Sequence, residues 1–484
     1  MTTTPDAPDP CVAEDCMVFE ALSAFLQGQA NAPARLLAAL ADPAAPMASD
    51  GTACSRLAAR VSGEVLCSEL ARLRPPPAAA AGRFIRQVVT AIESTRAHEV
   101  PEDMYALYFE HTMSPAAGAA GSRGDSMADD PLHSGTFRTL LVPPGAATPG
   151  ACPDWLAATS LPRHLSVPAT NRLISHGTTG LALWTASIAL AELLLGVGRP
   201  AGGPAAAFPL DIGVPPVDAA LGPDVTAEQL AALFAKPHFL SEHSRAMSVP
   251  EPGAWDTAAL VCPDRQALGH AGPAWVAGRR VLELGSGLGF LGLAAALAGA
   301  EHVRMTDAHG RVLSALDYSV EINAKQLRPG ALSTGVLDWA DFLAGIAPAT
   351  TPGALPSILS HPATGESAAA TEGQHFDLIL AADVIFEESL VVYLVAALRQ
   401  LLAGRRNFPL GALVANTMRR PETVAFFVAY ARAAGLQVRE ILPASGDGPG
   451  ASTPGGPCCE AMCRWSRPEA SRVIIMHVTA PIEV

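Results

Sequence analysis

The sequence predicts an α/β protein in which a mostly parallel sheet is covered by helices on both faces. From residue 280 onward, apolar segments of strand length alternate with longer segments of helical periodicity, which is typical of βα units. A second observation is the glycine-rich run "VLELGSGLGF" at 281–290, which begins in the first of those strands. A third is the helical spacing of apolar residues before residue 113, which predicts a separate small all-α domain.

Each predicted strand is a short apolar run, and each predicted helix repeats apolar residues every three or four positions. A further strand is expected in "FRTLLVPP" at 137–144, where the prolines would end it. Ligands of a parallel sheet bind beyond the carboxyl ends of its strands, so a site is expected at that edge. The other strands are expected at 280–284, 302–307, 333–338, 377–382, 411–416, 436–441 and 471–480, and helices at 289–299, 309–325, 388–403 and 421–434.

The domain organisation follows from shifts in composition. The helical region at 17–112 is followed by a linker rich in Gly, Ser and Asp, so we expect a helical N-terminal domain with its linker at 1–136 and a second domain at 137–484. The 42 glycines and 42 prolines exceed the usual share and predict long irregular insertions. These Ala, Gly and Pro-rich insertions are expected at about 196–278, 345–372 and 443–457.

The segment 171–195 predicts one helix with a capped start. The hydroxyl of Thr178 or Thr179 can accept a hydrogen bond from an unpaired amide in the first turn. Apolar residues then recur at helical spacing along one face. They are Leu181, Trp184, Ile188, Ala191 and Leu195.

An excess of acidic residues limits the partners that the chain can bind. It has 32 basic and 46 acidic residues and a formal net charge of −14. Such a surface repels the phosphates of nucleic acids, so no direct nucleic acid partner is expected. Nine cysteines without paired CxxC spacing favour a reducing compartment, and we expect a cytoplasmic protein without a secretory signal.

Neither a membrane span nor a metal site is expected. The stretch 281–300 is long enough to cross a membrane, but it would bury Glu283 in lipid and has glycines where a span favours leucine. The run "CCEAMC" at 458–463 offers three thiols, whereas a structural zinc ion takes four ligands. We therefore interpret this cluster as a chance grouping.

The glycine-rich run predicts a turn that holds a ligand without phosphate. A dinucleotide fold uses GxGxxG, but here the third glycine of that pattern is replaced by Phe290, and no GK[ST] follows. Glu283 lies in the strand before the turn, where it can meet a cation or a loop amide. Asp307 ends the next strand and can take both hydroxyls of a ribose. A cationic nucleoside fits this pattern, and S-adenosylmethionine is such a molecule; a turn without a ligand is the alternative.

Several segments together resemble the elongation factor 2 lysine methyltransferases, within the seven-strand protein lysine methyltransferases. The segment "SHGTTGLALWTASIALAEL" is the most specific, and "FEALSAFL" and "MYALYFEHTM" resemble the helical N-terminal region of that group. The resemblance runs from about residue 17 to the end and is broken by the insertions. The other segments that carry it are "ELGSGLGFLGL", "DAHGRVLSAL", "LDWAD", "LAADVIFE" and "NTMRRPETVAFFVAYARAAGL".

The resemblance implies a Rossmann-like sheet of seven strands, with the last strand antiparallel, and S-adenosylmethionine as cofactor. It assigns the cofactor contacts only where residues match. Trp184 would stack near the cofactor, Gly285, Ser286 and Gly287 would line its amino acid end, Asp307 would bind the ribose, Trp339 the adenine, and Ala382 would border the methionine moiety.

The same resemblance places Asp383 and Phe386 where the target amine enters. Asp383 would orient the amine, or it could instead cap the helix at 388–403. Phe386 stands where the family has tyrosine, and Thr185 where it has aspartate, so one phenol is missing from the mouth of the site. Phenylalanine is more often a core residue, so core packing is the favoured interpretation of Phe386.

The function implied is a protein-lysine N-methyltransferase acting on translation elongation factor 2, as a monomer. A methyltransferase of another protein or of a small molecule is an alternative, and so is a non-catalytic scaffold that retains the fold. The sequence "ADVIF" after the strand at 377–382 differs from the NPPY-type motif of enzymes that methylate amide or adenine nitrogens. Cofactor binding would distinguish an enzyme from a scaffold.

Overall fold

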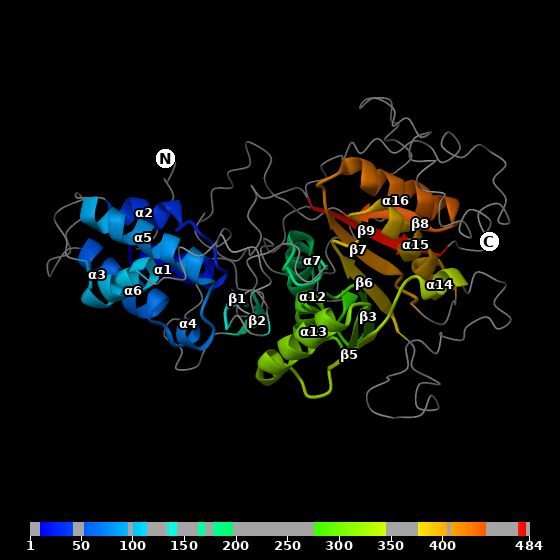
Figure 1. Cartoon of the computed structure of the whole chain (residues 1–484), viewed down its shortest axis with the longest axis horizontal. Coiled ribbons are helices and arrows are strands. Elements are labelled where there is room, and N and C mark those ends of the chain that lie inside the picture. The colour runs from blue at the N-terminus through cyan, green and yellow to red at the C-terminus, as the bar shows by residue number, and fades with distance from the viewer. Residues whose placement is uncertain are drawn as a thin grey trace, which may run out of the picture.

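A computed structural model shows a helical part joined to an α/β part (Figure 1). Among its described residues, no helix is long and apolar enough to cross a membrane. The "CCEAMC" run and most of the three expected insertions lie outside the described residues. The structure describes residues 10–41, 53–94, 100–113, 132, 135–142, 163–169, 178–196, 275–344, 376–403, 408–441 and 473–480.

Seven strands of the described chain form one sheet in the order β5-β4-β3-β6-β7-β9-β8. Strand β9 pairs antiparallel with β7 and β8, whereas the pairs among β3 to β7 are parallel. This confirms the predicted seven-stranded α/β fold with an antiparallel last strand. The strands are β3 (Arg280–Leu284), β4 (His302–Asp307), β5 (Leu332–Val336), β6 (Leu378–Ala382), β7 (Ala412–Thr417), β8 (Gln437–Ile441) and β9 (Val473–Thr479).

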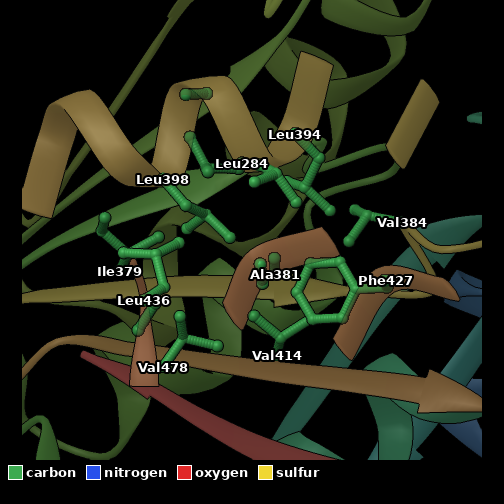
Figure 2. Packing of buried hydrophobic residues seen from close by; sticks show 14 of the residues in the cluster. Leu284, Ile379, Ala381, Val384, Leu394, Leu398, Val414, Phe427, Leu436 and Val478 are labelled. Atoms are coloured by element: carbon green, nitrogen blue, oxygen red, sulfur yellow. The ribbon is translucent and has the colours of Figure 1, made fainter. Parts of the chain in front are cut away.

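Helices cover both faces of the sheet, and each face has its own core. Because side chains alternate along a strand, Val281 packs with the helices of one face and Leu282 with those of the other. In Figure 2, Leu394 and Leu398 of a covering helix point toward Ile379 and other strand residues. One face carries α7 (Thr185–Leu195), α12 (Phe290–Leu297) and α13 (Gly310–Asn323), and the other α14 (Asp341–Ala344), α15 (Glu388–Ala403) and α16 (Pro421–Ala433).

The N-terminal part is helical, as predicted, and has a separate core. Phe25 and Phe84 pack there with ring centroids 5.3 Å apart. Buried Glu14 pairs with Arg56 and Arg60, which ties the first helix to the third. The elements are α1 (Pro10–Leu26), α2 (Ala34–Leu40), α3 (Ala53–Arg60), the π-helical turn η1 (Val61–Leu66), α4 (Glu69–Leu73), α5 (Ala78–Ser94) and α6 (Glu102–Met113).

An antiparallel pair of strands lies between the two parts (Figure 1). The predicted strand at 137–144 is β1 (Phe137–Leu141), and its partner β2 (His164–Pro168) was not predicted. Leu141 packs in the helical core, whereas its neighbour Leu140 packs in the core of the α/β part. Asn323 at the end of α13 pairs with both backbone groups of Ser166, at 2.6 and 2.8 Å. The strand pair therefore fixes the helical part to the sheet.

One predicted boundary was wrong. Helix α7 begins at Thr185, with Trp184 at the N-cap position, so neither Thr178 nor Thr179 caps it. The Thr178 hydroxyl accepts instead from the Gly180 amide at 3.0 Å, because residues 178–184 form a loop against the glycine turn. At the end of the expected insertion 196–278, buried Trp275 packs edge-on against His477, with ring centroids 5.3 Å apart. This end of the segment therefore belongs to the core.

Candidate cofactor and substrate site

A cavity of about 420 Å³ opens at the carboxyl ends of β3, β4 and β6. This is the edge at which a parallel sheet is expected to bind ligands. Every residue that the sequence nominated lines this one cavity. They are Trp184, Gly285, Ser286, Gly287, Asp307, Trp339, Ala382, Asp383 and Phe386.

The glycine turn forms the floor of the cavity, and it needs glycine for two reasons. Gly285 and Gly287 have φ values of +64° and +54°, in the left-handed region that L side chains rarely adopt. A Cβ atom on Gly287 would also lie 2.9 Å from the backbone oxygen of Gly180. On Gly285 it would lie 3.1 Å from the Trp339 ring. The turn therefore lets the 178–184 loop and Trp339 approach its backbone closely.

Ser286 locks the turn to the neighbouring strand β4. Its amide donates to the Thr306 oxygen at 2.8 Å, and its hydroxyl accepts from the Thr306 amide at 3.0 Å. The Thr306 hydroxyl in turn donates to the backbone oxygen of Glu283 at 2.6 Å. Ser286 is buried, so it shapes the turn as well as lining the cavity.

Glu283 is a buried carboxyl group with unused binding capacity. Its side chain is 2 % exposed, lines the cavity, and leaves the Oε2 atom without a hydrogen-bond partner among the described residues. Burial raises the pKa of Glu283 to about 8, because the charged form loses its hydration there. An unpartnered buried acceptor is costly unless a ligand satisfies it. A cationic ligand would provide that partner, and its charge would lower the pKa of Glu283 and favour loss of the proton.

Asp307 stands at the end of β4, beside the turn. Its carboxylate accepts from the Gly287 amide at 3.2 Å and from the His309 amide at 3.1 Å. Burial raises the pKa of Asp307 above its usual range, and the amide hydrogen bonds oppose that shift. Each oxygen keeps one lone pair for a further donor, such as a ribose hydroxyl. Trp339, across the turn, offers a partly buried aromatic ring for a flat ligand group.

Asp383 is a fully engaged carboxylate. Its Oδ2 atom accepts from the Ala186 amide and the Thr417 hydroxyl, each at 3.0 Å, and Oδ1 accepts from the Thr417 amide at 3.0 Å and pairs with Arg419 at 3.3 Å. It thus caps helix α7, and the interpretation that it caps the helix at 388–403 was wrong. Asp383 itself has φ of +55°, a strained conformation for a non-glycine residue, and these contacts hold it there.

Trp184 and Phe386 lie at the side of the cavity near Asp383. The Trp184 indole donates to the Thr179 oxygen at 3.0 Å, and the Arg419 guanidinium carbon lies 4.4 Å from its ring centroid. The side chain of Phe386 is 38 % exposed, so the core interpretation of this residue was wrong. It follows the end of β6, and the cavity reaches solvent beside it, as it does beside the exposed lining residues His309 and Asp338.

The sequence did not single out some residues of the site. Tyr393 of α15 lines the cavity. No motif or regular spacing in the sequence connects Tyr393 with the other site residues. Arg419 does not line the cavity itself and contacts two residues that do. Within the described part of the chain, no group of three or more His, Cys, Asp or Glu side chains is arranged to hold a metal ion.

The residues present fit S-adenosylmethionine. The floor admits close backbone approach, Asp307 can receive two hydroxyls, and the orphaned oxygen of Glu283 can receive a cationic group. Trp339 can contact a purine ring. The same cavity also reaches solvent beside Phe386, through which a second reactant could approach.

Comparison with known proteins shows that the α/β part is similar to one family. Residues 252–351 and 365–433 match the family model described as "Lysine methyltransferase". This part of the chain is similar to the lysine methyltransferase family. The family match begins at residue 252, inside the segment 196–278 that we expected to be an insertion.

Two curated relatives carry the name Protein-lysine N-methyltransferase EEF2KMT. The protein from Bos taurus is 32% identical over 173 residues, which are 35% of this chain and 48% of the relative. The protein from Mus musculus is 28% identical over 183 residues, 36% of this chain and 48% of the relative. The chain therefore spans about half the length of the curated relatives it matches.

Among solved structures, a TehB-like SAM-dependent methyltransferase from Corynebacterium glutamicum is 13% identical. The similarity covers 51% of this chain and 99% of that one, with a TM-score of 0.25. The fold assignment rests on the strand order described above.

Proposed function

We propose that this chain is an S-adenosylmethionine-dependent protein-lysine N-methyltransferase. The observation that carries the proposal is that three features line one cavity. They are a glycine turn without a phosphate-binding motif, the carboxyl groups of Glu283 and Asp307, and the opening to solvent beside Phe386, here called the mouth. The first two features suit a cationic nucleoside, and the third suits the aliphatic chain of a lysine. The match of residues 252–351 and 365–433 to the lysine methyltransferase family supports the same activity.

S-adenosylmethionine, when bound, supplies a methyl group on a positively charged sulfur, which an amine can take by in-line displacement. The chain's own part is to align the reactants and to admit an unprotonated amine. Free lysine has a pKa of about 10.4. Partial desolvation beside Phe386 would lower that pKa and so favour the neutral amine. Trp184 would hold the side of the mouth in place through its bond to Thr179.

Asp383 acts in this proposal as a positioning residue. We expected it to orient the incoming amine, but its four contacts occupy the lone pairs of both oxygens. It connects the start of α7 to the end of β7 and so sets where Trp184 stands. The amine would then be oriented by the shape of the mouth and by Phe386.

The proposed substrate is translation elongation factor 2. The motifs that resemble its lysine methyltransferases support this, as does the helical N-terminal part, which the structure joins to the sheet through β1 and β2. The name shared by the two curated relatives is consistent with it. We further propose that the chain acts as a monomer in the cytoplasm.

The test is methyl transfer from labelled S-adenosylmethionine to purified elongation factor 2. We expect one lysine to be labelled by the wild type, and no label with Gly287→Ala, whose Cβ would meet the Gly180 oxygen. Gly278→Ala is the matched control, because Gly278 has a similar φ of +68° but no atom within 4 Å of its Cβ position. We expect Gly278→Ala to label the substrate like the wild type.

Two other outcomes would redirect the assignment. Cofactor binding by calorimetry without any label on elongation factor 2 would favour another protein or a small molecule as substrate. No cofactor binding, with the protein folded by circular dichroism, would favour a non-catalytic scaffold and contradict the proposed activity.

A further inference from the structure

Arg419 is held in a fixed orientation just outside the cavity. It follows the end of β7, where its amide donates to the Thr417 oxygen at 2.8 Å. Its guanidinium group stacks on the Trp184 ring at 4.4 Å and pairs with Asp383 at 3.3 Å. Both partners are themselves anchored, Trp184 by its bond to Thr179 and Asp383 by its contacts with Ala186 and Thr417. An arginine held in this way loses little entropy when it binds a ligand.

Most of the hydrogen-bonding capacity of Arg419 is unused by the residues that the structure describes. Its side chain is 41 % exposed, whereas that of Asp383 is 1 % exposed. A guanidinium group has five N–H donors, and the pair with Asp383 engages only the Nη2 atom. The Nε and Nη1 atoms have no hydrogen-bond partner among the described residues. The N–H donors of Nε and Nη1 are therefore available to an acceptor from outside the chain.

The position of Arg419 beside the cavity suits it to bind an acidic group of the substrate. Trp184, Asp383 and Phe386 line the cavity near the mouth, and Arg419 contacts the first two from the outside. Arg419 and the two residues that it contacts form one rim of the cavity. Arg420, the next residue, is also exposed, so the rim carries two positive charges in a chain whose net charge is −14. A planar guanidinium group prefers a carboxylate, which it can bind through two parallel hydrogen bonds.

We infer that Arg419 is a specificity-determining residue that receives a carboxylate of the protein substrate close to the target lysine. This inference rests on the proposed function for its assignment of lysine as the group that enters. Trp184 and Asp383 fix the guanidinium plane, and the acidic side chain of the substrate completes its coordination. Segments with an acidic residue beside the lysine are then bound in preference to neutral ones.

The test uses two fluorescent probe peptides, in which one lysine is flanked either by Glu or by Gln. Their dissociation constants are measured by anisotropy with the cofactor-loaded full chain. We expect the wild type to prefer the Glu-flanked peptide by about tenfold, as for one charge-assisted pair. Arg419→Gln should remove that preference, and Arg419→Lys should keep part of it. Arg420→Gln is the matched control and should leave the discrimination mostly intact.

Several results would overturn the inference. They are a wild type that binds both peptides equally, a preference that survives Arg419→Gln, and an equal loss with Arg420→Gln. A parallel loss of cofactor affinity in Arg419→Gln, measured by calorimetry, would mean that Arg419 binds the carboxylate of the cofactor instead. Failure of the proposed function would give a different result. The wild type would still discriminate between the two peptides in the binding measurement, but it would leave elongation factor 2 unlabelled in the methyl-transfer assay.

Discussion

The buried carboxyl group of Glu283 makes stability depend on pH in a direction that can be tested. Its pKa is raised from an ordinary value of 4.5 to about 8 in the folded chain, because burial disfavours the charged form. The folded state therefore holds this proton more tightly than the unfolded state does. The stabilisation that comes from binding this proton to Glu283 is fully present below pH 4.5 and is lost as the pH rises through 8.

The size of the effect follows from the two pKa values of this group. Over the range from about pH 5.5 to about pH 8.5, the linkage relation gives a loss of about 3 kcal/mol in the free energy of unfolding. Asp307, whose pKa is also raised, changes stability in the same direction. Burial is the main reason why the pKa of His302 is lowered to about 4. His302 therefore destabilises the fold only as the pH falls below 6.5. Comparing the wild type with Glu283→Gln removes both of these contributions from the measurement.

The assay is urea unfolding of the wild type and Glu283→Gln without cofactor, at both ends of that pH range. Glutamine keeps the shape of the side chain and cannot ionise, so the variant should be the more stable protein at the alkaline end. We expect the stability of the wild type to fall by about 3 kcal/mol more than that of the variant. Parallel curves for the two proteins would show that Glu283 does not keep its proton at neutral pH, and the reasoning from burial would fail.

Three further substitutions, one of them with a matched control, test the site. Gly287→Ala should lower stability by about 2 kcal/mol and Gly278→Ala by about 1 kcal/mol in thermal unfolding, because only the first adds a close contact to the left-handed backbone; equal losses would contradict this. Asp383→Asn should cost about 3 kcal/mol in urea unfolding, since it removes a buried charge from four partners; a loss below about 1 kcal/mol would argue against the capping role. Phe386→Tyr should raise kcat/KM by up to about fivefold through one added hydrogen bond, with stability unchanged; a lower kcat/KM would refute a role for the missing phenol.

The sheet could be predicted because its signals are local. Each buried strand is a short apolar run, and glycine precedes β4, β5, β7 and β8, so the expected and observed strands agree to within a residue or two at most ends. Eight of the nine nominated residues share one cavity because parallel strands bring their carboxyl ends to one edge, and the loop before α7 adds Trp184. Strand β2 escaped notice because it carries Pro168, which usually argues against a strand.

The contacts that shape the mouth could not be predicted, because they join distant parts of the chain. Asp383 and Ala186 are 197 residues apart, and no periodicity relates them. We expected a threonine to cap α7, since capping is usually supplied by the residue before the helix. Here the cap is a carboxylate from the end of β6, which ties the helix to the sheet directly at the site. A local cap would hold α7 without fixing Trp184 relative to Phe386. The long-range cap holds α7 and also fixes Trp184 relative to Phe386. The stability of the helix and the geometry of the mouth therefore depend on the same side chain, that of Asp383.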